Sequence, residues 1–177
     1  MKIILFLGYS GSGKTHALTS ISRALVRARC GKIGTVKGIH DRSFTIDSKG
    51  KDTWLHACAG ASIVVALAPN EIDIIRKEKS TSIVDVREML GIFKRARVDY
   101  LLVEGAHKKF EAIRQAKRVI CARNEQEAKS LIRIHSSKIL FVTGEFAIRS
   151  KKREIDGIPI ISLPRDSGRA LNLIGKA

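Results

Sequence analysis

An eight-residue stretch near the start of the chain carries the residue types that bind a nucleoside triphosphate. GYSGSGKT, residues 8–15, matches the pattern GxxxxGK[ST] in full. Glycines let successive backbone N–H groups point at phosphate oxygens, and the N-terminus of a following helix favours negative charge. The lysine adds a positive charge at the β- and γ-phosphates, and the threonine hydroxyl ligates Mg²⁺. The residues expected to bind the nucleotide here are Gly8, Ser10, Gly11, Ser12, Gly13, Lys14 and Thr15.

A phosphate site of this kind also needs a carboxylate at the end of a neighbouring strand, where it can hold the Mg²⁺ shell. The apolar run Tyr100–Val103 is followed by Glu104 and Gly105, which supplies such a carboxylate. We expect Glu104 to bind Mg²⁺, directly or through water, or to polarise the attacking water. Lys14 and Glu104 are therefore the candidate catalytic residues, and Thr15 and Glu104 the candidate metal ligands.

A polar, irregular stretch at residues 38–52 is predicted to be a long loop, and long loops in compact domains are often functional. It follows a predicted strand at residues 32–37, so it should overhang the nucleotide. Asp47 or Asp52 could reach the metal, whereas Lys37 and Lys51 could reach a phosphate or an anionic substrate. Each of these side chains could equally be a solvated loop charge.

Strand-like and helix-like segments alternate along the whole chain. Helices are predicted at about residues 15–29, from Ser82 (with Asp85) through Phe93, and from Asn124 through Ile134, where Asn124 and Glu127 resemble a capping box. Strands are predicted at 3–7, 32–37, 63–68, 72–75, 100–103, 139–142 and 158–161. This alternation predicts a doubly wound α/β domain with a mainly parallel sheet, and ligands at the carboxyl ends of its strands.

Composition sets broad limits on the class of protein. The 177 residues, 44% of them hydrophobic, fit a single nucleotide-binding domain spanning residues 1–177. No apolar run is long enough to span a bilayer, so no membrane is expected. The cysteines Cys30, Cys58 and Cys121 form no CxxC pair, which is typical of a reducing compartment. A cytoplasmic location is the prediction.

The chain is strongly basic, with 33 Lys and Arg against 17 Asp and Glu and a formal charge of +16. Residues 108–153 hold 13 of these cations and four Glu. Such a surface attracts nucleic acid, an anionic cofactor or an acidic partner protein, or it is simply a solvated face.

Three segments together resemble the MobB family of molybdopterin-guanine dinucleotide biosynthesis adapter proteins. They are GYSGSGKT (8–15), KIGTVKGIH (32–40) and FTIDSKGKDTWLHACAGA (44–61), the last being similar to that family's FDIDxPGKDSxxHxxAGA stretch. LLVEGAHK (101–108) is similar to its LVLVEGFK segment. The resemblance covers about residues 1–108, and the basic segment 109–177 has no matching motif.

The resemblance implies a P-loop NTPase fold and a homodimer that binds GTP and Mg²⁺. It also implies a role in attaching GMP to molybdopterin, with the transfer itself performed by a molybdopterin guanylyltransferase. The implied partners are that enzyme, a molybdoenzyme apoprotein, or both, together with an anionic pterin cofactor. Weak GTP hydrolysis is expected, and Asp47, Lys51, Asp52 and His56 fall in the family's signature loop.

Two departures from the family pattern bear on the site. The family's KHxHH-like segment keeps only Lys37 and His40, which puts a role for its histidine cluster in doubt. The family often shows an Asp shortly after a late Val-Thr, where the purine base is read; Val142-Thr143-Gly144-Glu145 stands here, so Glu145 is the candidate substitute. No NKxD-type guanine signature is present, so GTP rather than ATP rests on the resemblance.

Two other functions compete with this interpretation. P-loop ligases of the dethiobiotin-synthetase type also place Glu-Gly after an apolar strand, and they would use ATP to activate a substrate carboxylate. A nucleic-acid-dependent NTPase would explain the +16 charge, but only 5% of residues are aromatic and none interleave with the cations for base stacking. A nucleic-acid partner is therefore not expected.

Overall fold

A computed structural model describes residues 1–41, 43–76, 83–110 and 113–175 of the chain. Contacts between residues divide the chain into two compact units. The first combines Met1–Gly38 with Val86–Ala177, and the second is Ile39–Asp85. Each unit is described by itself.

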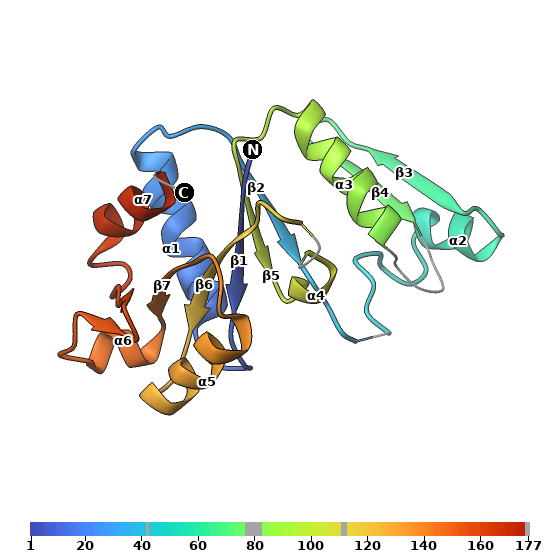
Figure 1. The fold of residues 1–177 in the computed structure, drawn as a ribbon. Helices are drawn as coiled ribbons and strands as arrows, with labels where there is room; N and C mark the ends of the chain where they lie inside the picture. Colours follow the sequence, from blue (N-terminus) through green and yellow to red (C-terminus); the bar gives the residue numbers. More distant parts are fainter. Residues whose placement is uncertain (42, 77–82, 111–112, 176–177) are drawn as a thin grey trace. The chain divides into compact units, whose positions relative to one another are not determined.

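The first unit is built on one parallel sheet with five strands (Figure 1). Every pair of neighbours in this sheet runs parallel. In spatial order the strands are β2 (Ile33–Lys37), β5 (Tyr100–Glu104), β1 (Lys2–Leu7), β6 (Lys117–Cys121) and β7 (Ile139–Thr143). The predicted α/β class with a mainly parallel sheet is thus confirmed.

Helices cover both faces of this sheet, which explains why its strands are continuous apolar runs rather than alternating ones. Ile3, Leu5 and Leu7 of β1 face one hydrophobic cluster, and Ile4 and Phe6 face the other. The second cluster contains residues of α1 (Lys14–Arg27) and α7 (Ser167–Gly175). The first contains residues of α3 (Ile83–Arg95), α4 (His107–Phe110), α5 (Glu125–His135) and α6 (Glu145–Arg149).

The second unit consists of one helix and a β-hairpin. Strands β3 (Ile63–Leu67) and β4 (Ile72–Arg76) pair antiparallel in a sheet of their own, and α2 (Asp52–Cys58) packs against β3. The two strands predicted here therefore exist, but they form a hairpin and not part of the parallel sheet. The short connection through Pro69 and Asn70 permits this, because parallel neighbours need a long crossover.

Several predicted boundaries hold to within two residues, and several elements were not predicted. The Asn124 side chain accepts from the Glu127 N–H at 2.9 Å, which confirms the predicted start of α5. The predicted start of α3 at Ser82 lies outside the described residues. Strand β6 and helices α4, α6 and α7 had no prediction. The strand expected at residues 158–161 is only β9 (Ile158–Pro159), which pairs with β8 (Glu154–Ile155), while Ile160 bridges to Val142.

Candidate functional site

The predicted phosphate loop lies at the topological switch point of the parallel sheet. Strand β1 has β5 on one side and β6 on the other, and Gly8 follows β1 directly. Ligands in open α/β sheets bind outside the carboxyl ends of the strands at such a point. The loop ends at Gly13, whose φ of 85° is in the left-handed region and which caps the N-terminus of α1 without a side-chain hydrogen bond. The first N–H groups of α1 are therefore free to meet an anion.

Backbone atoms at the ends of β6 and β7 pack closely against the phosphate loop. A Cβ atom on Gly8 would lie 2.3 Å from the carbonyl oxygen of Cys121, at the end of β6. Gly144 directly follows β7, and a Cβ atom on it would lie 2.6 Å from the carbonyl oxygen of Ser12 in the loop. Neither position tolerates a side chain, so the ends of β6 and β7 support the loop through its glycines. This role of the segments after β6 and β7 was not predicted, because glycine and short loops give no pairing signal in the sequence.

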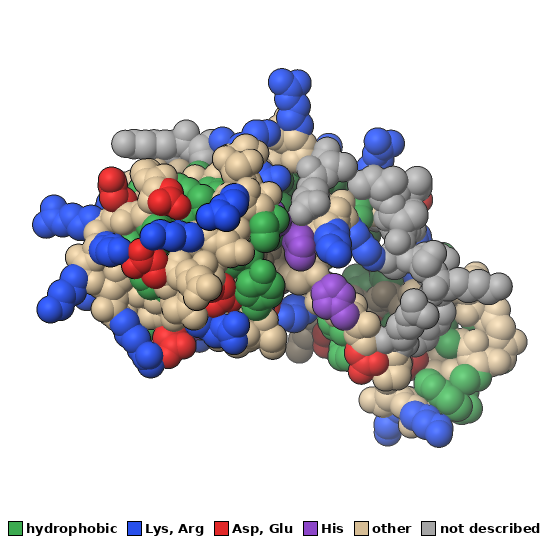
Figure 2. Space-filling model, turned by 60° about the horizontal axis from the view of Figure 1, so that its bottom comes forward, with side chains coloured by type: hydrophobic (Ala, Val, Ile, Leu, Met, Phe, Trp, Pro, Cys, Tyr) green, Lys and Arg blue, Asp and Glu red, His purple; other side chains and the backbone are tan. Residues whose placement is uncertain are grey.

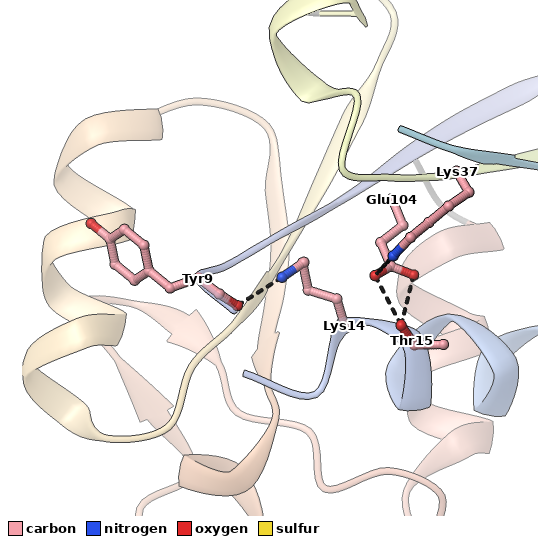
Figure 3. A network of polar contacts seen from close by, with 5 residues as sticks. All are labelled: Tyr9, Lys14, Thr15, Lys37 and Glu104. Carbon is pink, nitrogen blue, oxygen red and sulfur yellow. Dashed lines mark hydrogen bonds and ion pairs between the residues drawn. The ribbon is translucent and has the colours of Figure 1, made fainter. Parts of the chain in front are cut away.

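Two polar side chains of the loop have distinct surroundings. The Lys14 ammonium donates to the Tyr9 carbonyl oxygen at 2.7 Å across the loop, while the Tyr9 ring points away from it (Figure 3). The Ser12 hydroxyl is fully buried and has no hydrogen-bond partner among the residues that the structure describes. An unpaired buried hydroxyl is uncommon and costs stability. A phosphate oxygen in the loop would supply the acceptor that Ser12 lacks.

The predicted carboxylate meets the loop from the neighbouring strand (Figure 3). Glu104 is only 5% exposed, and both of its carboxylate oxygens accept from the Thr15 hydroxyl at 2.9 Å. Lys37 forms an ion pair with Glu104 at 2.5 Å. The strand register explains this neighbourhood, because Glu104 pairs with Lys37 on β2 and with Phe6 on β1. The structure thus brings Lys37, Thr15 and Glu104 together beside the phosphate loop.

The donor set beside the loop fits Mg²⁺. Hydroxyl and carboxylate oxygens are the ligands that this ion prefers, and Mg²⁺ usually keeps waters and substrate phosphates as its other ligands. The ranges that the structure describes contain no group of three or more His, Cys, Asp or Glu able to hold a metal ion alone. An ion at Thr15 and Glu104 would therefore depend on a bound nucleotide. The Lys37 ammonium now provides the positive charge beside Glu104.

Cys121 is the last residue of β6 and packs against Gly8 of the phosphate loop, and its thiol is a poor nucleophile. Burial is the main cause that raises the pKa of its thiol, to about 12; the nearby Glu104 charge acts in the same direction and Lys14 opposes it. The thiol is consequently protonated at neutral pH. Cys121 is completely buried, whereas Cys30 and Cys58 are exposed.

The other predicted binding residues belong to the second unit, which is described by itself. Asp47 Oδ1 accepts from the Thr53 hydroxyl at 2.7 Å, and its Oδ2 is buried without a partner among the described residues. Lys51 is the N-cap of α2 and Asp52 is its first residue, where a negative charge favours the helix dipole. These contacts order the loop and the start of α2, and binding roles for Asp47, Lys51 and Asp52 stay predictions.

Glu145, the candidate base-reading residue, begins α6 directly after Gly144. Its carboxylate pairs with Arg149 at 2.5 Å, and its side chain is about half exposed. Since Gly144 touches Ser12 through the backbone, Glu145 lies at the rim of the phosphate loop. A role in reading the base stays a prediction.

The loop, the switch point and the strand-end carboxylate together define a protein of the P-loop NTPase class. The sheet order β2-β5-β1-β6-β7 places the acid-bearing strand next to the loop-bearing strand, as Mg²⁺ and phosphate chemistry require. A family model described as MobB, molybdopterin guanine dinucleotide synthesis protein B, matches residues 3–144. The chain belongs to the MobB family, which confirms the resemblance found in its motifs.

Solved structures support the fold over the full length of the chain. A MobB protein homolog from Bacillus stearothermophilus is 20% identical, with a TM-score of 0.67 and full coverage of both chains. Bacillus subtilis MobB is 18% identical, with a TM-score of 0.68 and 98% of each chain covered. A structure of molybdopterin-guanine biosynthesis protein B is 23% identical, with a TM-score of 0.61 and 98% and 97% of the two chains covered. No curated protein matches the chain. Within the described ranges, no helix is long and apolar enough to cross a membrane.

Proposed function

We propose that this chain is a GTP-binding accessory protein in molybdenum or tungsten cofactor biosynthesis. It assists conversion of molybdopterin to molybdopterin-guanine dinucleotide in the cytoplasm and hydrolyses GTP slowly. The observation that carries the proposal is the buried carboxylate of Glu104 held at 2.9 Å from the Thr15 hydroxyl, next to the phosphate loop. The nucleotidyl transfer belongs to a partner guanylyltransferase, and the product passes to that enzyme or to a molybdoenzyme apoprotein.

Each residue of the site has a defined task in this proposal. The loop N–H groups and Lys14 bind the β- and γ-phosphates, with Lys14 exchanging its bond to the Tyr9 carbonyl for phosphate oxygens. Thr15 and Glu104 hold Mg²⁺, which neutralises charge that develops on the phosphates. With a cation held at Thr15 and Glu104, the Lys37 ammonium would no longer be the only positive charge at Glu104 and would be free to reach phosphate or an anionic substrate.

The hairpin unit supports the proposal of a homodimer. Ile63, Val65 and Leu67 of β3 and Ile72 and Ile74 of β4 are all more than half exposed. The register pairs Val65 with Ile74 and Leu67 with Ile72, so these residues share one face of the hairpin. A lone two-stranded hairpin is marginally stable in water, and an apolar face of this kind marks an interaction site. A second copy of the chain, related by a twofold axis, would cover it with the same residues.

The basic surface gives less support to nucleic-acid binding. Glu125 forms ion pairs with Lys129 and Lys152. Figure 2 shows Lys and Arg side chains distributed over the face in view rather than gathered in one stripe, with acidic side chains among them. Such a surface fits the phosphates of an anionic pterin better than a continuous polyanion, which needs a basic track.

Two variants test the proposed site. Lys14→Ala should reduce the affinity for Mg²⁺-GTP about 100-fold, or about 2.7 kcal/mol, without lowering the thermal unfolding midpoint. Glu104→Ala should lower the Mg²⁺-dependent hydrolysis rate more than the affinity, since its carboxylate acts on the ion. Titration calorimetry and phosphate-release assays measure the two effects.

Undiminished GTP binding by Lys14→Ala would overturn the assignment of the loop. An equal loss of binding and hydrolysis in Glu104→Ala would assign Glu104 a structural role. Formation of an ATP-dependent ligation product by the isolated protein would favour a dethiobiotin-synthetase type ligase, as the Glu104-Gly105 pair also permits.

A further inference from the structure

A groove of about 510 Å³ lies between α1 and α7, outside the phosphate loop. Figure 1 shows the two helices side by side. The lining residues from α1 and its C-cap follow one face of the helix, because they recur about every three or four residues, twice as adjacent pairs. They begin directly after Thr15 and are His16, Ser20, Arg23, Ala24, Arg27 and the C-cap Ala28. The opposite wall comes from Pro164, Ser167, Gly168 and Leu171.

The groove carries two unpaired cations. Within the described part of the chain, the guanidinium groups of Arg23 and Arg27 have neither a hydrogen bond nor an ion pair. The acid that directly precedes Ser167 in the chain, Asp166, already has partners: it accepts from the Ser162 N–H at 3.0 Å and pairs with Arg165. Arg165 is the main cause that holds the pKa of Asp166 below its usual range. The net field in the groove is therefore positive.

The start of α7 adds hydrogen-bond donors to the same groove. The Ser167 N–H donates to the Pro164 carbonyl at 3.2 Å and the Ala170 N–H to the Asp166 carbonyl at 3.1 Å, which leaves the Gly168 and Arg169 N–H groups without a backbone partner among the described residues. Gly168 exposes its backbone because nothing lies within 4 Å of where a Cβ would be. The Ser167 hydroxyl donates to the Pro164 carbonyl at 2.6 Å, which fixes this turn. Backbone N–H groups and the helix dipole both favour an anion here.

A serine side chain independently indicates a ligand. Ser20 is only 4% exposed and lines the groove, and no described residue forms a hydrogen bond with its Oγ. The hydroxyl of Ser22 on the same helix shows the usual alternative, since it donates to the Leu18 carbonyl at 2.9 Å. A ligand oxygen in the groove would supply the missing partner.

The remaining lining is apolar. Ala24, Ala28, Pro164 and Leu171 present small or flat surfaces between the polar groups. Ligand sites commonly combine such walls with a few convergent polar groups, in a volume of roughly 300–1,000 Å³. The combination fits a planar ring that carries one phosphate.

We propose that the α1–α7 groove binds an aromatic phosphate monoester, with the phosphate at Arg23, Arg27 and the start of α7. This phosphate is separate from those in the loop, since Arg23 lies eight residues, or about 12 Å along the helix, beyond Thr15. Given the proposed function, the natural occupant is the phosphorylated pterin.

Fluorescence titration with flavin mononucleotide tests the groove directly, because this probe joins a planar ring to a phosphate monoester. Wild-type protein should bind it, and riboflavin or inorganic phosphate alone should bind at least tenfold more weakly. Lys14→Ala should bind the flavin nucleotide within about twofold of wild type. The double variant Arg23→Ala/Arg27→Ala should lose at least tenfold, and Ser20→Ala about threefold without a lower unfolding midpoint.

A matched control is Lys94→Ala/Arg95→Ala, which removes two exposed cations from the last turn of α3 and should leave binding unchanged. An equal loss of flavin-nucleotide binding in this control would show that the effect depends on net charge alone and would overturn the proposal. Loss of binding in Lys14→Ala would also overturn it, because the probe would then occupy the phosphate loop. Equal binding of riboflavin or inorganic phosphate would overturn it as well. Failure of wild type to bind GTP while the flavin results hold would instead refute the proposed function and leave the groove intact.

Discussion

The parallel-sheet unit and the hairpin unit differ in how far the apolar residues of their strands are exposed. In the first, all of Ile3–Leu7 is at most 5% exposed, because helices cover both faces of the sheet. In the second, exposure alternates along β3 and β4, because α2 covers one face only. The residues that are more than half exposed are Ile63, Val65, Leu67, Ile72 and Ile74. A sheet buried on both faces holds Glu104, Lys37 and the phosphate loop in a fixed register. A hairpin buried on one face is suited to meeting another surface.

The contrast extends to polar groups. In the sheet unit, the Ser12 hydroxyl is buried at the phosphate loop and the Ser20 hydroxyl lines the α1–α7 groove, and neither has a hydrogen-bond partner among the described residues, so a ligand can satisfy them. In the hairpin unit, one oxygen of the Asp47 carboxylate accepts from Thr53 and orders its own loop, while the other is buried without a described partner. The sheet unit is thus organised around small ligands, and the hairpin unit around its own loop and an apolar face.

Thiol labelling gives the largest expected difference. Cys30 and Cys58 are exposed, whereas Cys121 is buried in the sheet, and burial raises the pKa of its thiol to about 12. Because alkylation requires the thiolate, at pH 8 Cys121 should react at least 1,000-fold more slowly than the other two. Iodoacetamide labelling followed by mass spectrometry should find two modified cysteines in native protein and three in denaturant. Rapid labelling of Cys121 in native protein would contradict a rigid sheet unit.

A matched pair of leucines compares the two units in stability. Leu101 of β5 is 0% exposed and Leu67 of β3 is 78% exposed. Leu101→Ala should lower the free energy of unfolding by about 3 kcal/mol, through lost burial and a cavity. Leu67→Ala should change it by less than about 0.5 kcal/mol at concentrations where the protein is monomeric. Urea unfolding measures both, and similar losses at the two positions would show that the hairpin face is buried within one chain.

A charge on the hairpin face should dissociate the proposed homodimer. Val65→Asp should raise the dimer dissociation constant at least tenfold, about 1.4 kcal/mol, because an unpaired carboxylate would be buried between two copies. Val26→Asp is the control, since Val26 is 64% exposed on α1 and lies outside the hairpin. Sedimentation equilibrium distinguishes the two. A wild-type monomer, or a dimer that tolerates Val65→Asp, would show that another surface or no self-association is involved.

The two units also differ in how much of their structure could be predicted from the sequence. The phosphate loop and Glu104 are local patterns, a glycine-rich motif after one buried strand and an acid after another, and parallel strands bring such ends together. Strand β6 was missed because it begins with Lys117 and Arg118 and has only three apolar residues. Its place beside β1 depends on long-range pairing.

In the hairpin unit, the strands themselves were predictable, but their pairing was not. Alternating exposure in β3 and β4 follows from covering one face, and nothing in their β-branched sequences separates that from a strand buried on both faces. The Lys37–Glu104 ion pair was also missed, since it depends on the register of β2 against β5. Single residues within a motif were found, and contacts between distant strands were not.

Calorimetric titration of the purified protein with GTP and with ATP, each with Mg²⁺, tests the proposed function most directly. The account predicts at least a tenfold preference for GTP, about 1.4 kcal/mol, and loss of most of that preference in Glu145→Ala. Equal binding of the two nucleotides, or a preference for ATP, would contradict a GTP-binding role in cofactor maturation.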